Sequence, residues 1–169
     1  DLDQQWRAAA DDDILVQAIV NPQLNSLASQ LLDYQESFPD HVEIYLTNRY
    51  GGLVAATNRP SDYYQADEAW WQAAYNEGRG ALYIGQPEYH ESAGYIALNM
   101  AAPIFAAEGS EVIGVARTTF RLDAIYEAVN RLQFGQTGHI TVIDSAGLVI
   151  ADPHPEHLGE QPSWSAPEI

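Results

Sequence analysis

The sequence predicts an α+β fold, with a long N-terminal helix followed by an antiparallel sheet of about five strands and flanking helices. Three observations lead to this fold class. Apolar residues recur at helical spacings between about residues 3 and 37. From Val42 the apolar period changes to two, and the strand-like segments are joined by short turns containing Gly or Asn. The length of 169 residues and the hydrophobic content of 46% allow the packed core of one domain, or of one domain and part of another.

The N-terminal region, residues 1–38, is predicted to be one long helix. Ile14, Leu24 and Leu31 belong to its irregular apolar stripe. Pro22 is expected to start a new helical segment or to kink the helix, because proline has no amide donor and restricts its own backbone.

The remaining elements follow from the same two periods. In chain order they are a hairpin over 42–58, a helix over 68–77, three strands between residues 80 and 122, a short helix over 123–132 and a second hairpin over 139–153. Asp67 is predicted to cap the helix that begins at Glu68, and Gly78 is predicted to end it.

An internal repeat predicts the domain organisation. Residues 44–58 and 140–154 share a hairpin plan, and "GLVAAT" aligns with "GLVIAD", so Gly52 and Gly147 are expected at the same place in each turn. The predicted domains are the long helix over 1–38, a first module over 39–125, and a connecting helix with an incomplete second module over 126–169.

The composition excludes several classes of function. The net charge is −17 and all seven basic residues are Arg, so binding to nucleic acid or to an anionic membrane surface through a basic patch is not expected. The absence of Cys excludes disulfides, zinc–thiolate sites and thiol catalysis. There is no run of about 18 apolar residues. No nucleophile elbow, P-loop, dinucleotide motif or HExxH motif is present, so we expect no enzyme and no cofactor.

Several segments together resemble the Cache family of PAS-like sensor domains. They include "GGLVAATNRPSDYYQADEAWWQAAY", "GYIALNMAAPIF", "EVIGVARTTFRLDAI" and "GQTGHITVIDSAGLVIADPHP". The resemblance implies an extracytoplasmic, small-molecule-sensing part of a transmembrane histidine kinase, chemoreceptor or cyclic-dinucleotide enzyme. It also implies a double-Cache arrangement in which this chain holds the membrane-distal module and the start of the membrane-proximal one. We further expect a homodimer through the N-terminal helix and a membrane-anchored parent protein.

The segment 61–75, "SDYYQADEAWWQAAY", is the first candidate for a binding site, because it is too aromatic for a solvated loop and too polar for a plain core. Adjacent tryptophans on a helix cannot both face the same way, so one is expected in the core and the other at a cavity or the surface. The second candidate is the tyrosine-rich stretch "YIGQPEYHESAGY", since tyrosine suits a small polar ligand in an apolar cavity. The predicted ligand-binding residues are Tyr63, Tyr64, Asp67, Trp70, Trp71, Tyr83, Tyr89, Tyr95, Arg117 and Thr119.

The pattern of amino-acid-binding Cache domains is only partly present. The resemblance places Glu68 where those domains carry an Arg that holds the ligand carboxylate, and Thr119 where they carry an Asp for the ligand amine. Both departures argue against an ordinary α-amino acid as the ligand. Strand alternation puts Arg117 on the face of Thr119, where it either binds an anion in the pocket or pairs with a neighbouring acid.

Other readings stay open. The aromatic residues of segment 61–75 would be plain core if nothing binds there, and the domain would then be a structural spacer. An extracytoplasmic hydrolase is the other alternative. Metal binding at "DPHPEHLGE" (Asp152, His154, Glu156, His157) is not expected, because two prolines and the lack of a helix do not preorganise a cage.

Overall fold

The computed structural model describes residues 1–90, 95–132, 138–144 and 146–162. These residues form two compact units, which are described separately. The first unit is Asp1–Gly85 with Asn99–Phe120, and the second is Gln86–Leu98 with Arg121–Ile169. The domain boundaries expected after residues 38 and 125 stay predictions. No helix in the described part of the chain is long and apolar enough to span a membrane.

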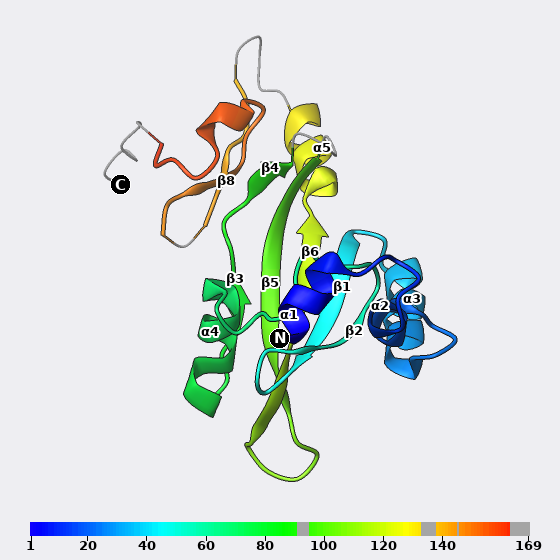
Figure 1. The fold of residues 1–169 in the computed structure, drawn as a ribbon. Helices are drawn as coiled ribbons and strands as arrows, with labels where there is room; N and C mark the ends of the chain where they lie inside the picture. The colour runs from blue at the N-terminus through cyan, green and yellow to red at the C-terminus, as the bar shows by residue number, and fades with distance from the viewer. Residues whose placement is uncertain (91–94, 133–137, 145, 163–169) are drawn as a thin grey trace. The chain divides into compact units, whose positions relative to one another are not determined.

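The N-terminal region forms three short helices, α1 (Leu2–Ala8), α2 (Ile14–Val20) and α3 (Ser26–Ser37) (Figure 1). The expectation of one long helix over residues 1–38 is therefore wrong. Asp13 caps α2 and Asn25 caps α3, each by accepting hydrogen bonds from backbone N–H groups in the first turn. Both cap residues have an extended backbone, so the chain leaves the helical conformation before each new helix begins. Pro22 lies in the turn between α2 and α3.

The main sheet has the strand order β2-β1-β6-β5-β3, and β4 also pairs with β5 (Figure 1). The strands are β1 (His41–Asn48), β2 (Leu53–Ala56), β3 (Tyr83–Ile84), β4 (Glu88–His90), β5 (Tyr95–Phe105) and β6 (Val112–Arg121). β1 pairs antiparallel with β2 and β6, and β3 and β4 each pair antiparallel with β5. The predicted antiparallel sheet is confirmed, with β4 as a short additional strand in what the sequence suggested was a turn.

The core of the first unit lies on one face of this sheet. The β1–β6 register sets Tyr45 opposite Arg117 and Thr47 opposite Val115, and successive strand residues alternate between faces, so these four side chains share a face. Tyr45 and Val115 belong to a buried cluster that also holds Trp6, Val16, Leu53, Trp70 and Trp71. The helix α4 (Ala69–Tyr75), which carries Trp70 and Trp71, therefore covers the same face of the sheet as the side chains of Tyr45 and Arg117.

Helix α4 (Ala69–Tyr75) begins one residue later than the sequence predicted. Its N-cap residue is Glu68, which has an extended backbone and makes no side-chain capping hydrogen bond. The prediction that Asp67 caps this helix is wrong for that reason. A short 3-10 turn, η1 (Asn76–Gly78), follows, and positive φ angles at Asn76, Glu77 and Gly78 end the helix.

The second unit contains α5 (Asp123–Arg131), β7 (Val142–Ile143), β8 (Val149–Ala151) and η2 (Pro155–His157). The predicted helix and second hairpin are therefore present. The β7–β8 hairpin repeats the β1–β2 plan, but the equivalent glycines are Gly51 and Gly147, not Gly52 and Gly147. Their φ angles are +82° and +81°. Each donates its N–H to the carbonyl three residues earlier, of Asn48 and Asp144 respectively, at 3.0 Å.

Candidate ligand-binding site

A polar pocket of about 280 Å³ lies in the first unit, on the face of the sheet that α4 covers. We call it the sheet pocket. Its floor consists of strand residues from β1, β5 and β6, and its cover consists of the loop before α4 and the first turn of that helix. The lining residues are Glu43, Tyr45, Pro60, Ser61, Asp62, Gln65, Glu68, Trp70, Asn99 and Arg117.

Arg117 is the central side chain of the sheet pocket. Its Nη1 donates to Glu43 Oε2 at 2.9 Å and its Nη2 donates to Asn99 Oδ1 at 2.7 Å. Its guanidinium carbon lies 5.0 Å from the centre of the Tyr45 ring and 5.4 Å from that of Trp70, within the range of cation–π attraction. The Arg117 side chain is 13% exposed. Its Nε is buried and has no hydrogen-bond partner among the described residues. Arg117 thus links β1, β5 and α4.

The strand register explains why these residues meet. Glu43 pairs with Thr119 and Tyr45 pairs with Arg117 across β1 and β6, so the four side chains point to the same face. Thr119 is buried beside the pocket, where its hydroxyl donates to Asn99 Oδ1 at 3.0 Å. Asn99 therefore accepts hydrogen bonds from both Arg117 and Thr119, which holds its amide in one orientation.

The loop before α4 is anchored to the sheet by polar contacts. Gln65, which is 2% exposed, accepts a hydrogen bond from the Tyr45 hydroxyl at 3.3 Å. Its amide nitrogen donates to the carbonyl and to Oδ1 of Asp62, each at 2.9 Å. Burial raises the pKa of the Tyr45 hydroxyl well above its ordinary value, so this group stays a neutral donor at physiological pH.

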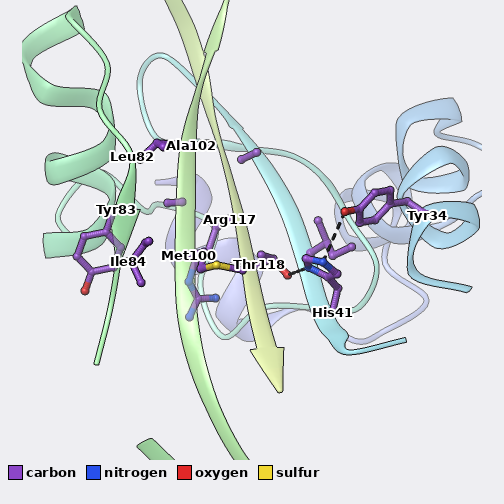
Figure 2. A pocket seen from close by; sticks show the side chains of 12 residues that line it. Tyr34, His41, Leu82, Tyr83, Ile84, Met100, Ala102, Arg117 and Thr118 are labelled. Atoms are coloured by element: carbon purple, nitrogen blue, oxygen red, sulfur yellow. Dashed lines mark hydrogen bonds between the residues drawn. The ribbon is translucent and has the colours of Figure 1, made fainter. Parts of the chain in front are cut away.

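A second hollow, of about 330 Å³, is lined by Ile44, Ala116 and Thr118, which alternate along their strands with residues of the sheet pocket, and Arg117 lines both cavities (Figure 2). Its walls are mainly apolar and include Ile84, Met100 and Ala102. At one end His41 Nδ1 lies 2.9 Å from Thr118 Oγ1. Figure 2 shows Tyr34 of α3 beside His41, and the Tyr34 hydroxyl lies 3.5 Å from His41 Nε2. Burial lowers the pKa of His41. This hollow has no polar lining comparable to that of the sheet pocket.

A third, wider hollow of about 630 Å³ lies near the N-terminus of the chain. Tyr63, Tyr64 and Asp67 line it together with Asp3 and Asn48. The Asp3 carboxylate accepts hydrogen bonds from the backbone N–H groups of Tyr63 and Tyr64, at 2.8 and 3.1 Å. These contacts hold the start of the loop that covers the sheet pocket.

Asp152 is a buried carboxylate of the second unit. Asp152 is 2% exposed, and it accepts hydrogen bonds from Thr141 Oγ1 and from the backbone N–H of His154. Burial alone would raise its pKa, but these bonds, a contact with His157 and the nearby His139 together lower the pKa below its ordinary value. Among the residues that the structure describes, no group of three or more His, Asp or Glu is placed to hold a metal ion.

A family model for the Cache domain (dCache_1) matches residues 4–165. The chain belongs to the Cache domain family. The resemblance inferred from the sequence is therefore confirmed. The methyl-accepting chemotaxis protein McpA of Pseudomonas putida is 29% identical to this Cache chain over 99 residues, which are 59% of this chain and 15% of McpA. The chain thus spans a small part of the length of that receptor.

Solved Cache-type structures share the fold. The ligand-binding domain of the Pseudomonas aeruginosa amino-acid chemoreceptor PctC, in complex with GABA, has a TM-score of 0.64 and 19% sequence identity, and the match covers 93% of this chain and 65% of that one. The sensor domain of the V. cholerae histidine kinase DctB has a TM-score of 0.54 at 19% identity, with 93% of this chain and 60% of that one covered.

The predicted site residues of this Cache chain are spread over several places. Trp70 and Arg117 line the sheet pocket, and Thr119 lies beside it. Tyr63, Tyr64 and Asp67 line the third hollow and Tyr83 lines the apolar one. In the second unit, Tyr89 is 55% exposed, and the ring of Tyr95 lies 5.1 Å from the guanidinium carbon of Arg121. The binding role of all ten stays a prediction.

The two adjacent tryptophans diverge as the helical spacing requires. Trp70 borders the sheet pocket, whereas Trp71 packs in the core, donates from Nε1 to Thr47 Oγ1 at 2.9 Å and stacks on the ring of Tyr75. Both are almost completely buried, with 7% and 6% exposure. The helical period predicts the divergence but does not tell which tryptophan borders the cavity.

Of the ten residues that line the sheet pocket, only Trp70 and Arg117 were among the predicted site residues. Glu43, Tyr45, Gln65 and Asn99 were not among the predicted site residues, although each lines the sheet pocket. The alternation of β1 does carry a usable signal, because Glu43 and Tyr45 share a face once β1 is paired with the strand that holds Arg117. Only the pairing of the strands identifies that neighbour, and pairing is not a local property of the sequence.

Proposed function

We propose that this Cache domain is the extracytoplasmic ligand-sensing part of a transmembrane chemoreceptor or histidine kinase, and that its ligand binds in the sheet pocket. The pocket carries the proposal, because it joins three strands of the sheet to a loop and a helix that form its cover. Solved relatives of the same fold include ligand-binding domains of chemoreceptors and a histidine kinase sensor domain. The domain itself is proposed to be non-catalytic, whatever the activity of the parent protein.

The cover of the pocket is the part that can respond to a ligand. At the edge of the cavity Trp70 on α4 lies against Arg117, and Gln65 in the loop accepts a hydrogen bond from Tyr45, so the cover and the sheet meet there. A small molecule that contacts both sides favours the arrangement in which the cover lies closest to the sheet. Its differential affinity for the closed and open arrangements shifts their populations, which is the thermodynamic requirement for a signal.

Calorimetric titration of the purified chain with amino acids, amines, organic acids and nucleobases tests this proposal, after a thermal-shift screen for hits. Trp70→Ala and Arg117→Lys are expected to lower the affinity of a hit about tenfold or more with the circular dichroism spectrum unchanged. Ile84→Ala is the control, because Ile84 is 67% exposed and lines the apolar hollow. A ligand lost in Ile84→Ala but retained in Trp70→Ala would move the site to the apolar hollow. If no compound binds, the alternative interpretation of the domain as a structural spacer is favoured instead.

Homodimerisation and membrane anchoring also stay proposals. The dimer was expected through one long helix, but residues 1–38 form three short helices, which offer no continuous stripe for a parallel coiled coil. Sedimentation equilibrium of the chain with and without ligand measures the oligomeric state directly.

A further inference from the structure

The walls of the sheet pocket carry more negative than positive charge. Three lining residues, Glu43, Asp62 and Glu68, are carboxylates, and Arg117 is the basic residue among the lining side chains. Glu43 and Arg117 neutralise each other as an ion pair at 2.9 Å. The other two carboxylates remain, so the lining has a negative formal charge, which favours a cation over an anion.

Asp62 has a cationic neighbour, but that neighbour lies outside the pocket. Arg7 approaches Asp62 at 3.2 Å, and its side chain is 55% exposed while that of Asp62 is 15% exposed. Arg7 is not part of the pocket lining. Because solvent screens an exposed guanidinium strongly, it compensates only a part of the negative charge that Asp62 presents to the cavity.

Glu68 presents a free carboxylate. It is the N-cap residue of α4, yet its side chain makes no capping hydrogen bond. Within the described residues its carboxylate is joined to no other side chain by a hydrogen bond or an ion pair. A carboxylate that is not used by the fold and lines a cavity is available to a ligand ammonium or guanidinium group.

Arg117, by contrast, is not free to hold a ligand carboxylate. Its two terminal nitrogens already donate to Glu43 and Asn99. A ligand carboxylate that formed a bidentate pair with Arg117 would have to displace these partners. The Glu43 side chain, which is 25% exposed, would then be left unpaired beside a second negative charge. Arg117 therefore serves as part of the wall.

The wall itself shows how a cationic side chain is held beside the cavity. The guanidinium of Arg117 lies against the rings of Tyr45 and Trp70 and is hydrogen-bonded to an acid and an amide. This arrangement combines cation–π attraction with charge-assisted hydrogen bonds. It is an observation separate from the excess of carboxylates among the lining residues.

We propose that the sheet pocket selects a small organic cation, a primary amine or a guanidine that bears no carboxylate. This inference rests on the proposed sensing function and specifies its ligand class. A cavity of about 280 Å³ is at the small end for ligand sites, so the cation is a compact one. Glu68 and Asp62 bind its charge, and Gln65 and Trp70 contact the remainder.

The test uses matched pairs of compounds that differ by one carboxylate. The chain is titrated calorimetrically with agmatine and L-arginine, with 1,4-diaminobutane and L-ornithine, and with further amines beside their α-carboxylated counterparts. We expect the member without the carboxylate to bind at least about tenfold more tightly in each pair that binds. Raising the salt from about 0.1 M to about 1 M should weaken this binding, because the Debye length shortens from about 10 Å to about 3 Å.

Two variants test whether the preference for amines arises in the sheet pocket. Glu68→Gln keeps the shape of an exposed side chain and should lower amine affinity about tenfold. Glu36→Gln makes the same change of charge at an exposed position of α3 that lines none of the three hollows described above, and should leave the affinity unchanged.

The outcomes separate this inference from the sensing function. If carboxylated compounds bind as tightly as their amine partners, or if the ligands found are neutral or anionic and are lost in Trp70→Ala, the ligand class is wrong and the sensing function stands. Equal amine affinity in Glu68→Gln and in the unmodified chain also overturns the class. If no compound of any charge binds, both proposals fail.

Discussion

Trp71 offers the sharpest test of how α4 is attached to the sheet. The indole is 6% exposed, its Nε1 donates to Thr47 Oγ1 at 2.9 Å, and its ring stacks on Tyr75 with centroids 4.6 Å apart. Trp71 does not line the sheet pocket, unlike its neighbour Trp70. Replacing Trp71 should therefore lower stability and leave the ligand affinity of the folded protein unchanged.

The expected loss of stability follows from these contacts. A buried tryptophan removes about 150–250 Å² from water, which at about 25 cal/mol per Å² amounts to roughly 4–6 kcal/mol as an upper estimate. Observed costs of truncating such a residue to alanine are about 3–5 kcal/mol, so Trp71→Ala is expected near about 4 kcal/mol. Trp71→Phe keeps an aromatic ring but loses the hydrogen bond and part of the buried surface, and is expected to cost about 2 kcal/mol.

Thermal unfolding followed by far-ultraviolet circular dichroism measures this cost. For a chain of this length each kcal/mol lowers Tm by about 2–4 °C, so Trp71→Phe should lower it by about 4–8 °C. Calorimetric titration of the folded variant supplies the affinity. Unchanged stability in Trp71→Phe would refute the buried hydrogen bond to Thr47. A large loss of affinity without a loss of stability would place Trp71 at the ligand instead of in the core.

Two further predictions concern strand pairing and pH. Gly114→Ala should lower the urea midpoint strongly, because an added Cβ would lie 2.2 Å from the Thr47 carbonyl oxygen, and an unchanged midpoint would contradict the close β1–β6 pairing. The pKa of Asp152 is lowered from an ordinary 3.8, so the stability that it contributes is present above pH 3.8 and is lost as the pH falls through its lower folded pKa. The stability difference between the unmodified chain and Asp152→Asn should therefore shrink in acid, and a difference independent of pH would show that Asp152 does not carry the effect.

Much of the fold follows from local features of the sequence. The change of apolar period at Val42 and the turn residues of the two hairpins identify most strands and helices in their correct order. Each of these signals acts within a few residues, so neighbouring positions carry the information. The helix predicted to stop at Gly78 ends at Tyr75, because Asn76 already has a left-handed backbone. The net charge of −17 likewise depends on composition alone. The prediction of one long N-terminal helix was wrong because the helical conformation ends at Ala9 and again at Asn21, and new helices begin after the N-caps Asp13 and Asn25. An irregular apolar stripe does not reveal these interruptions.

The sheet pocket is a property of the tertiary structure. Glu43 lies on β1, which is far in the sequence from the strands β5 and β6 that hold Asn99 and Arg117, and the hydrogen bonds among the three side chains depend on how the strands pair. The sequence alone placed Arg117 on a face but left its partner open between a ligand anion and a nearby acid. The pairing of β1 with β6 makes Glu43 a hydrogen-bond partner of Arg117. A one-residue shift in register would turn the Glu43 carboxylate to the opposite face of the sheet.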